Sequence, residues 1–208
     1  MHLSTLKLWN FRKFGDGAEF SLTKPNLSLT FNSGLNVLIG ENDSGKSAII
    51  DAIRFVLKTH SYDWTRIDES DFYAGQQRLR IELVLSGFGV DEGKNFTEFL
   101  SWEKVEGKVS PRLFLNLNVC RNPSNGQILP YEVRAGSDAH GRALSPEARE
   151  YLKVTYLKPL RDAEEELVAR KNSRLSQILV GHDAFKSNSP DHVLLKLLTE
   201  FNGAIERY

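Results

Sequence analysis

Apolar and polar residues alternate in several short runs near the start of the chain, a pattern that is typical of β-strands. Such runs cover residues 3–11, 18–22 and 27–31, and turn-forming residues such as glycine, proline and asparagine separate them. A fourth run, at residues 35–39, reads Leu-Asn-Val-Leu-Ile and is apolar at four of its five positions. Its composition predicts a strand that is buried on both faces.

A helical period replaces this alternation soon after residue 39. Apolar residues recur there at helical spacing: Ala48, Ile49, Ala52, Ile53, Val56 and Leu57. This spacing predicts a helix from about Gly45 to Lys58. Residues 59–77 are polar and aromatic without a regular period, so we expect a loop there.

Strand-like runs return in the middle of the chain. They cover residues 78–86, 95–105, 111–119 and 127–135, and glycine, proline or asparagine separates each run from the next. Strands that follow one another with such short connections usually pair antiparallel. We therefore expect an antiparallel meander in this part of the chain.

The pattern becomes mainly helical near Ser145. The sequence Ser-Pro-Glu at residues 145–147 is a typical helix start, because serine caps the first turn and proline is tolerated in it. The expected elements are a short helix at 145–153, a strand at 154–157 and helices at 159–179 and 190–205.

Charge and composition narrow the possible partners. Lysine plus arginine and aspartate plus glutamate both number 27, so the formal net charge is zero and any contact with DNA must be local. The single cysteine cannot form an internal disulfide, which suits a reducing cytosol. No apolar stretch approaches the ~20 residues of a membrane span, and the N-terminus lacks the apolar core of a signal peptide. We therefore expect a cytoplasmic protein with no membrane partner.

Residues 40–47 carry the most specific chemical signal in the chain. They read Gly-Glu-Asn-Asp-Ser-Gly-Lys-Ser and fit the pattern G-x-x-x-x-G-K-[ST] without a substitution. A predicted strand precedes them and a predicted helix follows, which is the order that a phosphate-binding loop requires. Glycines let successive backbone N–H groups point inward, and the helix start adds about half a positive charge. The alternative is a glycine-rich turn that only caps the helix. We disfavour it, because such a turn would not need the full pattern.

This loop predicts ATP and Mg²⁺ as ligands. Lys46 can reach the β- and γ-phosphates, and the Ser47 hydroxyl can ligate Mg²⁺. The residues predicted to bind the nucleotide through the loop are Gly40, Glu41, Asn42, Asp43, Ser44, Gly45, Lys46, Ser47 and Ala48. The choice between ATP and GTP stays open. The chain lacks the Asn-Lys-x-Asp motif that would indicate guanine, and this absence only favours adenine.

Two parts of the chain resemble known ATPase families. Asn-Phe-Arg-Lys-Phe at residues 10–14, together with Gly34-Leu35-Asn36 and the loop that follows, resembles the SMC/RecF branch of ABC-type ATPases. Residues 155–164 and Ser-Arg-Leu at 173–175 resemble the overcoming-lysogenization-defect (OLD) family of ATP-dependent nucleases. The resemblance implies an ATPase head that dimerises around two ATP molecules, is followed by a Toprim nuclease domain, and acts on DNA.

The same resemblance implies a role for Arg12. In this family an arginine at the end of the first strand would approach the phosphates of the nucleotide. The alternative is an arginine on the surface after a strand, because one arginine by itself carries little information.

Several parts of a complete ATPase are missing from the sequence. ATP hydrolysis needs a second apolar strand that ends in an aspartate for Mg²⁺ and a carboxylate that orients water. Asp91 and Asp162 do not qualify, since glycine, serine, lysine or proline interrupts the apolar run before each of them. Gln76 and Gln77 precede their strand, whereas the magnesium-contacting glutamine of this family follows one. The signature loop and the Toprim carboxylates are not found either, so we identify no catalytic residue.

Together these observations predict an α/β P-loop NTPase of ABC-ATPase type with a mixed central sheet, truncated before the Walker B strand. We expect a nucleotide-binding αβ core at residues 1–144 and the start of a helical lobe at 145–208. Three functions remain open: the ATPase head of an OLD-like nuclease in DNA repair or phage defence, a RecF- or SMC-like repair ATPase without a nuclease, and a stand-alone nucleotide-binding module without turnover. This fragment alone is expected to hydrolyse ATP weakly or not at all.

Overall fold

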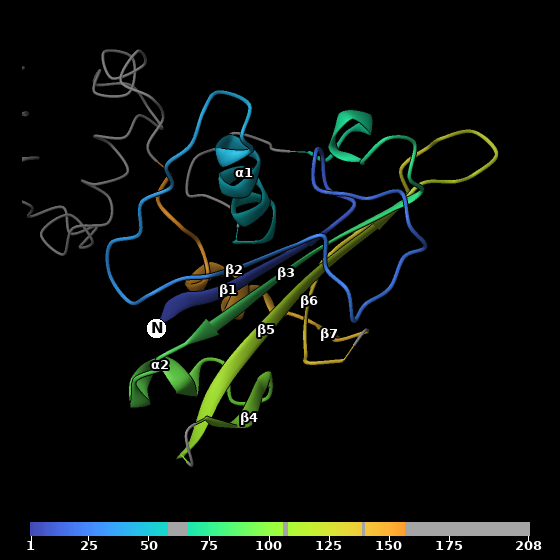
Figure 1. The fold of residues 1–208 in the computed structure, drawn as a ribbon. Helices are drawn as coiled ribbons and strands as arrows, with labels where there is room; N and C mark the ends of the chain where they lie inside the picture. The colour runs from blue at the N-terminus through green and yellow to red at the C-terminus, as the bar shows by residue number, and fades with distance from the viewer. Residues whose placement is uncertain (58–65, 106–107, 139, 157–208) are drawn as a thin grey trace, which may run out of the picture. The chain divides into compact units, whose positions relative to one another are not determined.

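The computed structural model describes residues 1–57, 66–105, 108–138 and 140–156 (Figure 1). Contacts divide the chain into two units, of which the first contains residues 1–59 and 63–154 and the second contains the remainder. All elements below belong to the first unit. The helices expected at 159–179 and 190–205 lie outside the described residues, and the predicted boundary at residue 145 stays a prediction.

One antiparallel sheet organises the described residues. In spatial order its strands are β2 (Leu27–Thr30), β1 (His2–Trp9), β3 (Arg78–Ser86), β5 (Lys108–Cys120), β6 (Val133–Ala135) and β7 (Arg142–Ala143), and β4 (Leu100–Val105) also pairs with β5. Every pairing among these strands is antiparallel. The antiparallel pairing expected for residues 78–135 is therefore confirmed. The strands do not follow one another as a simple meander, because β3 pairs with β5 rather than with β4.

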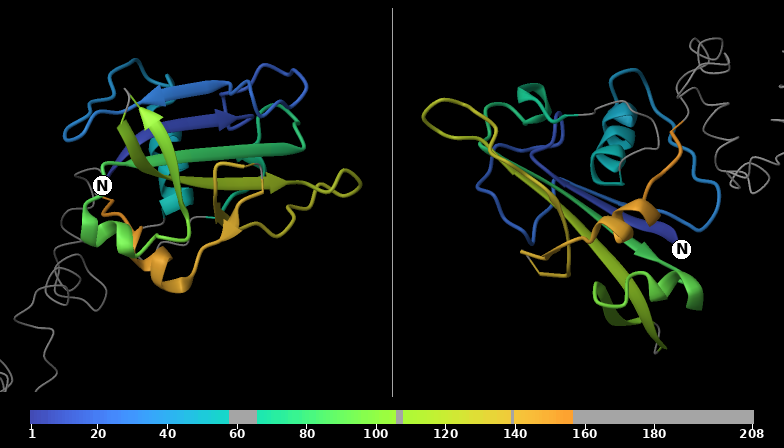
Figure 2. Two further views of the ribbon diagram at one scale, coloured as in Figure 1. Left: turned by 90° about the horizontal axis from the view of Figure 1, so that it is seen from below. Right: turned by 180° about the vertical axis from the view of Figure 1, so that it is seen from behind.

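Helix α1 (Lys46–Leu57) lies across one face of this sheet, where it contacts β3 and β5 (Figure 2). Strand alternation turns one set of side chains of β3 toward this face, and all of them are buried: Leu79, Ile81, Leu83 and Leu85. The helix contributes an apolar stripe that includes Ala52 and Phe55. The ring of Phe55 meets the ring of Phe11 edge to face, with centroids 6.1 Å apart. The apolar stripe of α1 and this face of the sheet bury each other and form the core. This packing holds α1 against the sheet.

The opposite face of the sheet holds a buried charge network. Arg80 on β3 and Asn116 on β5 are only 2% and 1% exposed. The guanidinium of Arg80 donates to Asn116 and, at 3.0 Å, to Glu82. Glu82 also accepts a hydrogen bond of 2.9 Å from Lys7 on β1, and the Trp9 ring centroid lies 5.6 Å from the Arg80 guanidinium carbon. The network therefore links β1, β3 and β5.

Short helices mark the ends of the sheet. The 3₁₀ helix η1 (Glu69–Asp71) precedes β3, and α2 (Val90–Lys94) follows it. Helix α3 (Pro146–Tyr151) begins as predicted, because the Ser145 hydroxyl accepts a hydrogen bond of 3.2 Å from the Ala148 amide. Within the described part of the chain, no helix is both long and apolar enough to cross a membrane.

The buried strand predicted at residues 35–39 is wrong. This segment is not a strand, and Leu35, Val37 and Ile39 are 90%, 68% and 91% exposed. The side chain of Asn36 instead bonds locally, since it donates to the Asn32 and Gly34 carbonyls. Such local bonds compete with strand pairing, and no strand among the described residues pairs with this segment.

Other predicted strands are absent or shorter than expected. The run at 18–22 forms a loop, in which the Ser21 carbonyl accepts a hydrogen bond from the Trp9 indole instead of a neighbouring strand. The run at 95–105 forms a strand only in β4, and the run at 127–135 only in β6. Of residues 154–156, only Val154 makes a β-bridge.

Candidate functional site

The loop at residues 40–47 enters α1 through two left-handed backbone positions. Asp43 has a φ of +62° and Gly45 a φ of +101°. A Cβ atom at Gly45 would lie 2.6 Å from the ring of Phe14. Glycine is therefore required at position 45 both by the backbone angle and by the close approach of the Phe11–Phe14 turn.

A substitution of Gly45 tests this close approach. We expect Gly45→Ala to lower the free energy of unfolding by about 1–3 kcal/mol, and by more than the control, because alanine is strained at this φ and its Cβ would also press on the Phe14 ring. Gly17→Ala is the matched control, since Gly17 has a φ of +70° and no atom within 4 Å of its Cβ position. Urea unfolding of both variants measures the difference. An equal loss in the two variants would show that Phe14 does not restrict position 45.

The side chain of Lys46 bends back over the loop. Its ammonium group donates to the Gly40 carbonyl at 2.7 Å, to the Glu41 carbonyl at 2.6 Å and to the Ser44 hydroxyl at 3.2 Å. These three acceptors are neutral. None of them therefore offsets the charge of the ammonium group, which can exchange them for an anionic oxygen.

An open cavity of about 610 Å³ lies against this loop. Its lining residues are Arg12, Lys13, Asn42, Asp43, Ser44, Gly45, Lys46, Ser47 and Ala48. The structure thus brings Arg12 together with seven of the nine predicted loop residues. Gly40 and Glu41 contribute through the carbonyl groups that hold Lys46. Three basic side chains meet at one cavity, which is what a polyphosphate would require.

Arg12 lines the cavity, but two carboxylates hold its guanidinium group. The Nε atom donates to Asp71 at 2.8 Å, and Nη1 donates to Asp51 at 2.7 Å. Burial by itself would lower the pKa of Arg12, yet the hydrogen bonds to Asp71 and Asp51 outweigh it and the pKa is raised above its ordinary value. Arg12 therefore links α1 to η1 in this structure, and its predicted contact with phosphate stays a prediction.

The residues of this site suit a nucleotide and its magnesium ion. Residues 42–48 of the loop and the helix start line the cavity, where backbone N–H groups can meet a bulky anion. The described residues contain no group of three or more histidine, cysteine, aspartate or glutamate side chains that could hold a metal by themselves. Mg²⁺ would then take the Ser47 hydroxyl together with phosphate oxygens, which is how this ion usually binds at P-loops.

The residues rejected as catalytic carboxylates lie away from any buried strand end where the structure describes them. Asp91 is on α2, with its side chain 94% exposed and paired with Lys94. Asp162 lies outside the described residues. Gln76 has a structural contact, because its carbonyl accepts a hydrogen bond of 2.8 Å from Arg121. Gln77 is an exposed loop residue.

Three residues of this site were not predicted from the sequence. Lys13 lines the cavity, and Asp51 and Asp71 hold Arg12. The adjacency of Lys13 to Arg12 was the available signal. No sequence signal pointed to Asp51 and Asp71, since they lie 39 and 59 positions from Arg12 along the chain.

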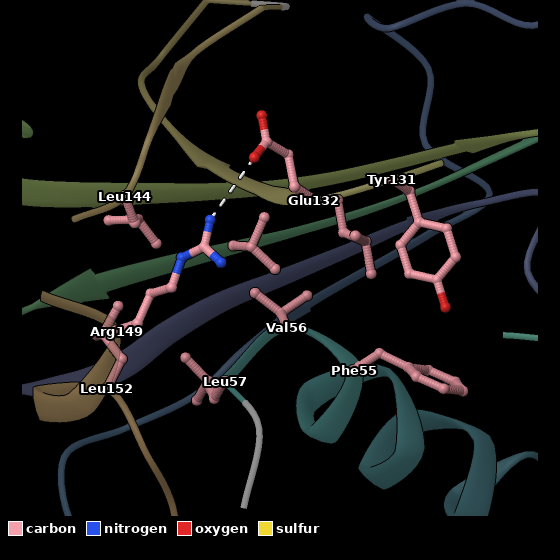
Figure 3. A pocket seen from close by; sticks show the side chains of 10 residues that line it. Phe55, Val56, Leu57, Tyr131, Glu132, Leu144, Arg149 and Leu152 are labelled. Atoms are coloured by element: carbon pink, nitrogen blue, oxygen red, sulfur yellow. Dashed lines mark ion pairs between the residues drawn. The ribbon is translucent and has the colours of Figure 1, made fainter. Parts of the chain in front are cut away.

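A second cavity lies at the other end of α1 (Figure 3). It encloses about 110 Å³, and most of its lining is apolar: Phe55, Val56, Leu57, Leu117, Val133, Leu144 and Leu152. Glu132 and Arg149 form an ion pair of 3.7 Å beside it. The twelve residues of α1 span about 18 Å, so the two cavities are separate. Its apolar walls do not suit a phosphate.

The sequence of this site matches a known family. Residues 5–180 match AAA_23, a family of AAA domains. The chain belongs to this family. The fold of this AAA domain is accordingly that of a P-loop NTPase of ABC-ATPase type, as the sequence predicted.

Curated relatives of this AAA domain are ATPases of the SMC/RecF-like superfamily. The DNA replication and repair protein RecF of Pediococcus pentosaceus is 40% identical over 62 residues, which cover 30% of this chain and 14% of the relative. The DNA double-strand break repair Rad50 ATPase of Thermoplasma volcanium is 33% identical over 89 residues, or 43% of this chain and 9% of the relative. RecF of Francisella tularensis subsp. novicida is 25% identical over 187 residues, or 85% of this chain and 48% of the relative. Each match thus spans less than half of the relative's length.

Proposed function

We propose that this chain is the ATP-binding part of an SMC/RecF-like ATPase head that acts in DNA repair. The observation that carries the proposal is the cavity at residues 42–48, where a left-handed loop, the start of α1 and three basic side chains meet. Similarity to RecF and Rad50 supports the assignment to repair.

In the proposed mechanism the loop holds the phosphates of ATP. Backbone N–H groups at the start of α1 would donate to the phosphate oxygens, and Lys46 would exchange its carbonyl acceptors for them. When bound, Mg²⁺ would neutralise charge on the β- and γ-phosphates. The Ser47 hydroxyl would ligate that ion, and Arg12 fixes α1 beside the cavity through Asp51.

Association of two heads would follow nucleotide binding. The SMC/RecF resemblance supports a dimer that closes around two ATP molecules, with DNA bound by the full-length protein. The described residues supply no carboxylate pair at a buried strand end, so we propose that this chain alone binds ATP with little or no turnover.

An OLD-like nuclease is the second candidate. It is favoured by the sequence at residues 155–164 and 173–175, which resembles that family. Under this proposal a Toprim domain elsewhere in the full-length protein would cut DNA. A RecF- or SMC-like head without a nuclease accounts for the P-loop equally well, and a nuclease assay of the full-length protein distinguishes the two.

Titration of the chain with ATP and with GTP, each with and without Mg²⁺, tests the proposed function. We expect saturable binding of ATP that Mg²⁺ strengthens, since the ion reduces repulsion among the phosphates. Isothermal titration calorimetry gives the dissociation constants. Failure of both nucleotides to bind at millimolar concentration would overturn the proposal, and tighter binding of GTP would overturn the assignment to ATP.

A further inference from the structure

We propose that Lys13 is a second phosphate-binding cation, so that two lysines rather than one set the affinity of the loop for nucleotide. This inference rests on the proposed function and names a further residue of the same site. No part of the P-loop pattern contains Lys13, because it belongs to the turn that precedes β2.

The turn that carries Lys13 is firmly held. Phe11 and Phe14 exchange two backbone hydrogen bonds of 3.0 and 2.8 Å, and this pair encloses Arg12 and Lys13. Phe11 is fully buried and also bridges Phe72. A turn fixed at both ends holds the backbone from which the side chain of Lys13 reaches the loop.

This turn lies directly against the phosphate loop. The Lys13 ammonium group donates a hydrogen bond to the Asp43 carbonyl. The Cδ atom of Lys13 lies 3.1 Å from the Cβ position of Gly45. Lys13 and Lys46 line the same cavity, so their ammonium groups lie at the same loop although they are 33 positions apart in the sequence.

The charges around the cavity distinguish Lys13 from Arg12. Asp51 and Asp71 neutralise Arg12, with nitrogen–oxygen distances of 2.7 and 2.8 Å. Among the described residues, no carboxylate forms an ion pair with Lys13 or Lys46. No described carboxylate therefore offsets the charge of either lysine by an ion pair. A triphosphate is the ligand class that can take both, because it offers several anionic oxygens to separate donors.

If Lys13 had a purely structural role, we would expect a different salt dependence of ATP binding. If Lys13 only ordered the loop through the Asp43 carbonyl, its removal would weaken binding equally at all salt concentrations. A cation that contacts phosphate makes the affinity depend on ionic strength, since salt screens the attraction. The salt dependence of ATP binding therefore separates the two roles.

The test compares ATP binding by the wild type, Lys13→Met, Lys13→Arg and Lys24→Met at about 50 and 300 mM salt. Lys24→Met is the control, because it removes the same charge from a side chain that is 77% exposed and does not line this cavity. We expect Lys13→Met to weaken ATP binding about tenfold at low salt and to show a smaller salt dependence than the wild type. Lys13→Arg should bind within about threefold of the wild type, and Lys24→Met should be unchanged.

Two results would overturn the role of Lys13 while leaving the proposed function intact. One is that Lys13→Met binds ATP as tightly as Lys24→Met. The other is that Lys13→Met binds more weakly but keeps the salt dependence of the wild type, which assigns Lys13 to ordering the loop. Absence of ATP binding by the wild type would instead overturn the proposed function, and this inference with it. Circular dichroism of each variant confirms that it is folded.

Discussion

Replacing Lys46 with alanine is expected to weaken ATP binding by at least about 100-fold while leaving the protein folded. The ammonium group of Lys46 donates to three acceptors of its own loop, at 2.6–3.2 Å. It would donate to phosphate oxygens in the complex, where a charge-assisted hydrogen bond contributes about 1.5–3 kcal/mol. Loss of two such bonds, about 3 kcal/mol or more, corresponds to a factor of at least about 100 in the dissociation constant.

Isothermal titration calorimetry with ATP measures the loss of affinity in Lys46→Ala. Lys94→Ala is the control, since Lys94 is 70% exposed, lies on α2 and pairs only locally with Asp91. Both variants should unfold in urea with free energies close to that of the wild type. Unchanged ATP affinity in Lys46→Ala would show that the loop does not bind nucleotide through this lysine.

The largest effect on stability is expected on the other face of the sheet. Arg80→Met should lower the free energy of unfolding by about 3 kcal/mol, because it removes one partner from a buried charge network. The side chains of Arg80 and Glu82 are 3% and 13% exposed. Methionine would leave the Asn116 side-chain oxygen without its arginine donor, whereas Glu82 would keep Lys7.

Urea unfolding with tryptophan fluorescence measures this loss. Arg134→Met is the matched control, since Arg134 is on β6 of the same sheet, is 46% exposed and pairs with Glu132 on the surface. Its removal should cost less than about 1 kcal/mol. ATP affinity of folded Arg80→Met should match the wild type. If the two variants lose the same free energy of unfolding, the buried network does not stabilise the sheet.

Local patterns in the sequence predicted much of the fold. The helical spacing of residues 48–57 corresponds to α1, and the alternation of residues 78–86 corresponds to β3. Both signals are properties of one element and its buried face, so they need no knowledge of distant residues. The Ser145 cap is local in the same way.

The strands that were predicted wrongly have a common physical cause. An apolar run such as residues 35–39 becomes a buried strand only if other strands pair with it, and pairing depends on residues that are distant in the sequence. In the described part of the chain β2 occupies the sheet edge, and the side chains of Leu35 and Ile39 stay exposed. The sequence alone did not reveal which segment would pair with which.

In the candidate site, too, local features could be predicted from the sequence and contacts between distant residues could not. The loop at residues 40–47 was predictable, because its function lies in consecutive backbone groups and one lysine. Its surroundings were not, since the bridge between Phe11 and Phe72 brings Arg12 next to Asp71. The turn from Phe11 to Phe14 likewise places Lys13 against Gly45. Contacts of this kind become visible only in the folded chain.

The most direct test of the account is an NMR titration of the isotopically labelled chain with ATP and Mg²⁺. If the loop holds phosphates, the amide resonances of residues 40–48 shift first and furthest, with Gly45 and Lys46 among the largest changes. Residues around the apolar cavity at Phe55 and Leu152 should stay unchanged at the same ATP concentrations. Shifts confined to that second cavity, or to residues outside the loop, would contradict nucleotide binding at the start of α1.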